Sequence, residues 1–319
     1  MSGPRILLTG ATGFIGSAVL RTLSRAVADE GADLAVRAVV RAAPAGQESL
    51  PGVEWARADL TDPASLRGLG SGCDVLLHLA ARVGGDADAC TAVNVGGTSA
   101  LVREARRAGI ARVLLLSTAA VYGAGPHSGI PVDGVEPAPV SAASATRLAA
   151  ERLVREAGGT VLRPGLVLGR GDRWVVPALA ELTARVPARW NGGRGRLSLV
   201  DVRDLARLIA ALARAGRLPG GVHHASHPEP VRVADLLARL AEHGVLPEVA
   251  ERDWPLDRCL AELARTPGRA GERQFRLLAE DHWYESREIW RLADCPPGPG
   301  PLAGLADTAG WYRSLLAGR

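Results

Sequence analysis

The stretch TGATGFIG, residues 9–16, decides the fold because it places a glycine at every third position, at Gly10, Gly13 and Gly16. It follows the apolar run RILL and opens a segment, residues 14–31, whose apolar side chains have helical spacing. Glycines at such a strand-to-helix turn let a pyrophosphate approach the amides at the helix N-terminus. The stretch therefore predicts a dinucleotide-binding unit.

The same alternation of strand and helix continues through the first half of the chain. Four further apolar runs are separated by helical segments, with a short helix expected from Asp62 and a long one ending near Ala108. Such alternation predicts an α/β fold, a doubly wound parallel sheet of the Rossmann type. We assign residues 1–165 to this dinucleotide-binding domain and 166–319 mainly to a smaller C-terminal substrate-binding lobe, with the chain free to cross between them. The four runs are LAVRAVVR (34–41), VEWARAD (53–59), DVLLHLA (74–80) and RVLLLST (112–118).

The composition is that of an ordinary soluble protein. Of the 319 residues 47% are hydrophobic, and the net charge of +4 comes from arginines scattered among acids, with no lysine anywhere. No basic run indicates nucleic-acid binding, and no apolar run approaches the roughly 20 residues of a membrane helix. The four cysteines and the histidines of GVHHASHPEP lack the spacing of a metal site. We therefore expect a cytoplasmic protein without a metal, either a monomer or a homodimer.

The glycine spacing and six further motifs in the same order resemble the extended short-chain dehydrogenases/reductases of the NAD-dependent epimerase/dehydratase type. The motifs are ADL (58–60), HLAA (78–81), NVGGT (94–98), LSTAAVYG (116–123), LRPGLVLG (162–169) and LSLVDVRDLA (197–206). The resemblance implies that Thr118 supplies the hydroxyl that faces the reacting carbonyl. It also implies cofactor contacts from Gly10, Thr12, Gly13, Phe14, Ile15, Gly16, Asp59, Leu60, Leu79, Ala80, Ala81, Asn94, Arg147 and Pro164.

The choice of dinucleotide depends on the end of the second strand. NAD-binding proteins place an acid there to accept hydrogen bonds from the ribose hydroxyls, whereas a 2′-phosphate needs cationic donors. Here the strand ends in VVRAAP, and Arg41 can form a charge-assisted pair with phosphate. We therefore expect NADP(H), with NAD(H) as the alternative if Arg41 is only a solvated residue at the strand end.

The catalytic pair of this family is missing. Its Tyr-x-x-x-Lys motif places two residues on one helix face, where the lysine lowers the pKa of the tyrosine and holds the nicotinamide ribose. Aligning ATRLAAERL with the usual ASKLAAERL puts Ala143 at the tyrosine position and Arg147 at the lysine position. Arg147 can still donate hydrogen bonds to the ribose, or it can pair with Glu151 one helical turn later; both interpretations remain open.

Other side chains are candidates for the missing chemistry. We consider Thr118 as a donor to the carbonyl oxygen, Tyr122 as either a substrate contact or a locally packed residue, and His127 as a titratable group or a solvated loop residue. The C-terminal half holds most of the tryptophans, in a chain with few aromatic residues, which favours an apolar substrate. The substrate contacts that we expect are Arg82, Tyr122, His127, Trp174 and Trp190.

Three functions remain open. The first is a reductase that moves hydride from NADPH to a ketone; the second is a nucleotide-sugar epimerase, dehydratase or ketoreductase with a replacement acid; the third is a silent dinucleotide-binding protein. Losing the pair weighs most against epimerases and dehydratases, since they first oxidise an alcohol and need a base. Among family members without the pair, the chain is similar in kind to angucyclinone ketoreductases, which implies reduction of a ring ketone on a large aromatic polyketide, assisted by the substrate.

Overall fold

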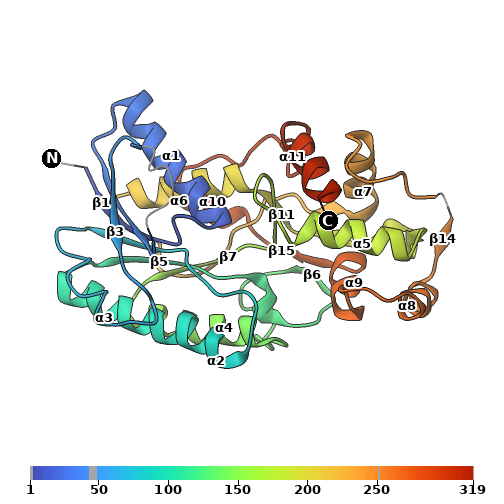
Figure 1. Ribbon diagram of the computed structural model, residues 1–319, viewed down its shortest axis with the longest axis horizontal. Coiled ribbons are helices and arrows are strands. Elements are labelled where there is room, and N and C mark those ends of the chain that lie inside the picture. Colours follow the sequence, from blue (N-terminus) through green and yellow to red (C-terminus); the bar gives the residue numbers. More distant parts are fainter. Residues whose placement is uncertain (1–2, 43–48, 251, 319) are drawn as a thin grey trace.

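The computed structural model describes residues 3–42, 49–250 and 252–318, and its centre is a parallel sheet of seven strands. The strand order is β12-β7-β5-β4-β1-β2-β3, so the chain starts in the middle and winds outward in both directions (Figure 1). This is the doubly wound Rossmann-type sheet that the alternating pattern predicted. The strands are β1 (Arg5–Thr9), β2 (Ala35–Val40), β3 (Val53–Arg57), β4 (Val75–His78), β5 (Arg112–Leu116), β7 (Thr160–Arg163) and β12 (Gly221–His224).

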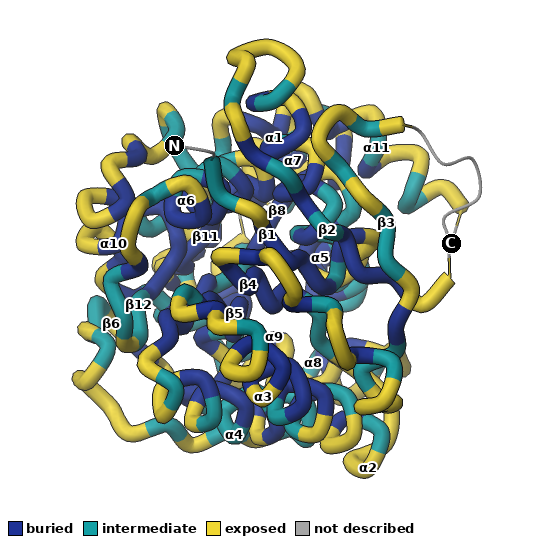
Figure 2. Tube along the Cα trace, turned by 90° about the vertical axis from the view of Figure 1, so that its left-hand side faces the viewer, coloured by how far each residue is buried: buried dark blue, intermediate teal, exposed yellow. Residues whose placement is uncertain are grey.

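Helices cover both faces of the sheet because successive side chains of a strand point to opposite sides. In β1, Ile6 and Leu8 join the core under one helical layer, while Leu7 joins the core under the other. The central strands are accordingly buried (Figure 2). One layer contains α1 (Phe14–Glu30), α6 (Val202–Arg214) and α10 (Arg287–Leu292); the other contains α2 (Ala87–Cys90), η1 (Thr91–Gly97), α3 (Thr98–Ala108) and α4 (Ala142–Glu156).

The helix expected from Asp62 is absent, and residues 60–72 form a series of turns instead. Pro63 cannot donate a backbone hydrogen bond, and Gly68 and Gly72 adopt positive φ angles of 81° and 71°. The long helix that ends at Ala108 is present, but its first half is a π-helix, Thr91–Gly97. The sequence pattern did not reveal this irregularity.

The second lobe has its own core, built around Trp190 and Phe275. The chain nevertheless returns to the sheet, since β12 pairs with β7 and α6 packs against α1. A boundary at residue 165 therefore does not divide the chain cleanly. The remaining elements are β6 (His127–Ile130), β8 (Leu166–Leu168), β9 (Arg189–Trp190), β10 (Arg196–Leu197), β11 (Leu199–Asp201), β13 (Val231–Arg232), β14 (Asp253–Trp254), β15 (His282–Tyr284), α5 (Val175–Arg185), α7 (Val233–Glu242), α8 (Leu256–Arg265), α9 (Glu272–Ala279) and α11 (Leu305–Ala317), with 3₁₀ turns η2 (Ala119–Tyr122) and η3 (Asn191–Gly193).

No helix in the described ranges is both long and apolar enough to cross a bilayer.

Candidate functional site

The glycine turn between β1 and α1 is shaped for a ligand that approaches the backbone. Gly10 has φ 78°, and a Cβ atom there would lie only 2.6 Å from the backbone nitrogen of Ala80. A Cβ atom at Gly16 would overlap the carbonyl oxygen of Gly10. Gly13 caps α1 without a side-chain hydrogen bond, and the first turn of α1 carries no acid. The first amides of α1 are thus free to bind a pyrophosphate.

Replacing Gly10 with Ala should raise the dissociation constant for the dinucleotide at least about tenfold, because the methyl group displaces either the turn or the loop that starts at Ala80. Isothermal titration with NADPH and NADH measures this effect. Gly31 is the matched control, since it also has positive φ, 64°, but nothing lies within 4 Å of its would-be Cβ. An equal loss of affinity in Gly31→Ala would attribute the effect to strain alone.

At the adenosine end, Arg41 directly follows β2 and is exposed. The carbonyl oxygen of Arg41 accepts a hydrogen bond from Arg57 Nε at 3.2 Å. The guanidinium of Arg41 takes no part in this bond. Asp59, after β3, accepts hydrogen bonds from the backbone nitrogen and the hydroxyl of Thr61 at 2.8 and 2.7 Å. These bonds lower the pKa of Asp59, so that its carboxylate stays charged at neutral pH. The contacts expected from Arg41, Asp59 and Leu60 remain predictions.

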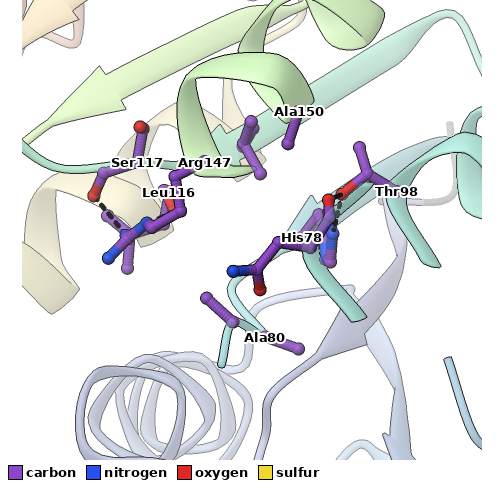
Figure 3. Close-up of a pocket in the computed structure, with 10 residues that line it drawn as sticks. His78, Ala80, Thr98, Leu116, Ser117, Arg147 and Ala150 are labelled. Atoms are coloured by element: carbon purple, nitrogen blue, oxygen red, sulfur yellow. Dashed lines mark hydrogen bonds between the residues drawn. The ribbon is translucent and has the colours of Figure 1, made fainter. Parts of the chain in front are cut away.

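A small pocket, where we expect the nicotinamide, is lined by residues from β4, η1, α3, β5 and α4 (Figure 3). His78 lies at its base, where Nδ1 is 2.7 Å from the hydroxyl of Thr9 and Nε2 is 2.9 Å from that of Thr98. Thr98 donates its own proton to the carbonyl oxygen of Asn94, so His78 carries its hydrogen on Nε2. Burial lowers the pKa of His78 to about 4. His78 is therefore a neutral, fully hydrogen-bonded residue at neutral pH and not an available acid.

Asn94 holds the neighbouring loop. Its Oδ1 accepts a hydrogen bond from the backbone nitrogen of Arg82 at 2.7 Å, and its Nδ2 donates to the carbonyl oxygen of Arg82 and the hydroxyl of Thr146, both at 3.0 Å. Both N–H bonds of the amide are used within the protein, so the predicted cofactor contact cannot be a donation from Asn94. Asn94 therefore positions the wall of the pocket, and its contact with the cofactor remains a prediction. Sequence reasoning missed Thr146, which joins this loop to α4.

Arg147 projects from α4 toward the end of β5 (Figure 3). Its Nη2 donates to the carbonyl oxygens of Ser117 at 2.5 Å and Leu116 at 3.0 Å, while its buried Nε has no hydrogen-bond partner among the described residues. Burial lowers the pKa of Arg147 to about 10, which leaves it charged at neutral pH. The proposed pair with Glu151 is wrong, because Glu151 binds Arg163 instead. Arg147 thus lines the pocket with an unused donor, and its contact with a ribose remains a prediction.

Thr118 stands at the end of β5 with a hydroxyl that can still donate. Its Oγ1 accepts a hydrogen bond from the backbone nitrogen of Ala120 at 3.2 Å, which caps η2 and leaves the O–H bond free. The backbone nitrogen of Ala119 donates to the carbonyl oxygen of Pro164 at 2.8 Å, so the Pro164 segment lies beside Thr118. Ala143, at the start of α4, offers only a methyl group at the position where the resemblance led us to expect a tyrosine.

A buried ion pair lies behind this end of the site. Glu151 and Arg163 are at most 4% exposed, their closest atoms are 2.5 Å apart, and Ser117 donates its hydroxyl to Glu151. Arg163 Nη1 also donates to the hydroxyl oxygen of Tyr122 at 2.8 Å, and His224 Nε2 lies 2.7 Å from that oxygen. The network therefore joins β5, α4, β7 and β12, and it fixes the backbone from which Thr118 and Arg147 act.

Two of the expected substrate contacts are buried in this region. Tyr122 is 2% exposed and its hydroxyl is occupied by the network, while burial raises its pKa. His127 is 7% exposed, lies on β6 rather than in a loop, and faces the hydroxyl of Tyr284 at 3.2 Å. Burial lowers the pKa of His127, which disfavours its charged form. Both predictions of substrate contact are wrong, because side chains from β12 and β15 cover these residues.

Of the two tryptophans expected to contact the substrate, one is buried and one is exposed. Trp190 is fully buried, donates its Nε1–H to the carbonyl oxygen of Val186 and packs on Phe275 with ring centroids 4.8 Å apart. Its predicted substrate contact is wrong, since it belongs to the core of the lobe. Trp174, by contrast, is 65% exposed, and Arg82 is also exposed; both remain candidates. Among described residues the exposed large apolar side chains are Val83, Val135, Val140, Trp174 and Leu292.

Comparison with known proteins places the chain among nicotinamide-dependent enzymes. The sequence model of the NAD dependent epimerase/dehydratase family matches residues 6–223. A 4-hydroxy-2-methyl-3-oxo-4-farnesyl-3,4-dihydroquinoline-1-oxide ketoreductase from Stigmatella aurantiaca is 32% identical, over 86% of this chain and 84% of its own. A 2-alkyl-3-oxoalkanoate reductase from Stenotrophomonas maltophilia is 29% identical, over 88% and 91%. The structure of MoeE5 in complex with UDP-glucuronic acid and NAD has the same fold, with a TM-score of 0.70, 23% identity and coverage of 98% and 100%.

Proposed function

Because the chain belongs to the NAD dependent epimerase/dehydratase family, we propose that it is an NADPH-dependent ketoreductase without the usual acid–base pair. The observation that carries this proposal is the pocket beside Arg147: Ala143 replaces the tyrosine, and His78 is neutral with both ring nitrogens hydrogen-bonded. Such a site lacks the base that oxidation of a sugar alcohol requires. Reduction asks less of the protein, since a ketone can accept hydride with only a hydrogen bond to its oxygen.

The substrate that we propose is a flat polycyclic ketone of the aromatic polyketide class. Val83, Val140 and Trp174 are exposed in the loops that follow β4, precede α4 and follow β8. Exposed apolar side chains near a polar site favour a large apolar ligand. The absence of the pair also makes the chain similar in kind to the ketoreductase that acts on the angucyclinone of simocyclinone-type antibiotics. That likeness, together with the two relatives named as reductases, favours a ketone substrate.

In this proposal the protein mainly orients its ligands. A bound nicotinamide cofactor would supply the hydride. The first amides of α1 hold the pyrophosphate, and Arg147, whose buried Nε has no hydrogen-bond partner among the described residues, lines the pocket proposed for the nicotinamide. The hydroxyl of Thr118 donates to the ketone oxygen and so aligns the carbonyl. The proton comes from the substrate and, in the end, from solvent.

An NADPH-oxidation screen tests the proposal. Polycyclic aromatic ketones should be reduced, while 4-keto nucleotide sugars should not be turned over at a measurable rate. Turnover of a 4-keto nucleotide sugar would indicate instead a nucleotide-sugar enzyme with a replacement acid. Tight NADPH binding without oxidation by either class would favour a silent dinucleotide-binding protein.

The preference for NADPH has its own test. Replacing Arg41 with Asp should raise the KM for NADPH about tenfold or more, because a charge-assisted pair with the 2′-phosphate is lost and a repulsive charge is gained. The KM for NADH should change little. Equal changes in the two KM values would show that Arg41 does not bind the 2′-phosphate.

We further propose a cytoplasmic protein that acts as a monomer or homodimer. All four cysteines are free and buried, as is usual in a reducing compartment.

A further inference from the structure

The chain from Pro164 to Trp174 passes two parts of the proposed site, and its last part is the Gly169–Trp174 segment between β8 and α5. Pro164 lies just before β8, and its carbonyl oxygen accepts a hydrogen bond from the backbone nitrogen of Ala119, next to Thr118. Farther along, a Cβ atom at Gly171 would lie 2.7 Å from the ring of Phe14, the first residue of α1. The chain therefore passes Thr118 at Pro164, before β8, and the first residue of α1 at Gly171, after β8, before it reaches Trp174.

The buried carboxylate of Asp172 sets the direction of the chain at Trp174. Asp172 is 1% exposed, and its Oδ1 accepts hydrogen bonds from the backbone nitrogens of Trp174 at 2.8 Å and Val175 at 2.9 Å. Its Oδ2 accepts a third from Val176 at 3.1 Å. Three bonds to consecutive backbone nitrogens fix where α5 begins. They also fix where the exposed indole of Trp174 leaves the backbone.

A residue from the C-terminal helix completes this arrangement. Tyr312 on α11 is fully buried; its hydroxyl donates to Asp172 Oδ2 at 3.2 Å and accepts from the backbone nitrogen of Gly169 at 2.8 Å. One hydroxyl thus joins both ends of the segment. The helix itself is held by its apolar face, since Leu305 and Ala309 join Tyr312 in the core of the lobe. Figure 1 shows α11 beside α5, the helix that begins directly after the Gly169–Trp174 segment.

We propose that Tyr312 is a positioning residue for the ketone: it holds the Gly169–Trp174 segment so that the indole of Trp174 forms an aromatic wall against the flat substrate. The inference rests on the proposed function, because it takes the ligand to be a polycyclic ketone. Part of the substrate affinity would then depend on α11, because Tyr312 lies 140 residues after Asp172 along the chain. Offset stacking on an indole suits a flat aromatic ligand, which buries a large area against it.

The variant Tyr312→Phe tests this role because it removes the hydroxyl and keeps the ring. The KM for a polycyclic ketone should rise about three- to tenfold, the effect of one hydrogen bond, while the KM for NADPH stays within about twofold. In a Trp174→Ala background the same substitution should have no further effect on the KM for the ketone. Acrylamide quenching of Trp174 fluorescence, obtained as the difference from a Trp174→Phe variant, should also change without substrate.

The matched control is Thr308→Val on the same helix. Thr308 is buried and bonds only within α11, to the carbonyl oxygens of Gly304 and Leu305, so its loss should leave the KM for the ketone and the quenching unchanged. Equal KM values in Tyr312→Phe and wild type, or a KM effect that persists without Trp174, would overturn the proposal. A change in quenching without a change in KM would overturn it too. If the wild-type protein reduces no ketone, the proposed function fails. Unchanged quenching in Tyr312→Phe would instead show that Tyr312 does not position Trp174, whatever the substrate is.

Discussion

A polycyclic ketone whose neighbouring phenol is methylated should be reduced about 10²–10⁴-fold more slowly than the parent ketone, which is the usual contribution of a positioned general acid. The reason is that the described residues that we propose for this site offer no suitable acid. His78 is neutral and fully bonded, Arg147 holds its proton up to a pKa of about 10, and Ala143 carries no hydroxyl. A phenol already hydrogen-bonded to the ketone oxygen can polarise the carbonyl itself. Methylation removes this donor, and single-turnover kinetics with saturating NADPH measure the loss.

Side-chain variants provide the control for this result. Thr118→Val should slow reduction only modestly, because a hydroxyl that orients the carbonyl gives up no proton. Ala143→Tyr should not accelerate it, since no lysine is present to lower the pKa of the new phenol. If instead one side-chain substitution abolishes turnover while NADPH and ketone still bind, that residue is the acid and the substrate-assisted mechanism is wrong.

Replacing Glu151 with Ala should lower the free energy of unfolding by about 3–5 kcal/mol, the cost of leaving one member of a buried ion pair without its partner. Arg163 is 4% exposed and cannot turn to solvent without unpacking β7. The same substitution removes the acceptor for the hydroxyl of Ser117. Chemical denaturation at neutral pH measures the change, and NADPH affinity should fall as well, because Ser117 adjoins both Thr118 and the contact with Arg147.

Glu242 is the comparison for this measurement. It forms an ion pair with Arg239 at 2.8 Å, but both side chains are about half exposed, so Glu242→Ala should cost no more than about 1 kcal/mol. The double variant Glu151→Leu with Arg163→Met should be less destabilised than the two single variants together, since it leaves no unpaired charge. Additive losses would show that packing, and not the charge left behind, accounts for the cost.

The dinucleotide-binding half could be predicted from the sequence because its signals are local. A glycine at every third position between an apolar run and a helix identifies one turn, and that turn accounts for the backbone close approaches at Gly10 and Gly16. The parallel, doubly wound sheet follows from the alternation of strands and helices, whereas its strand order was not predicted. The position of Arg41 directly after β2 was predicted for the same reason.

The roles of individual side chains were harder to predict because they depend on partners that are distant in sequence. Tyr122 is covered by His224 and His127 by Tyr284, each from a strand more than 100 residues later. Glu151 has an arginine four residues before it, yet a residue on the neighbouring strand β7 offers better geometry. The π-helix that contains Asn94 leaves no sign in the apolar spacing. The sequence shows which side chains could take part in chemistry. Whether each of them is buried depends on how the helices and strands pack.

The return of the chain to the sheet through α6 and β12 makes the two halves inseparable as folding units. A fragment that ended at residue 165 would expose the edge of β7, which β12 covers by pairing from Gly221 to His224. It would also uncover the apolar face that α6 buries against α1. Open strand edges beside bare apolar surface promote aggregation. Insertions or exchanges of the lobe between related enzymes should therefore be made in surface loops that leave α6 and β12 intact, and not at the apparent junction.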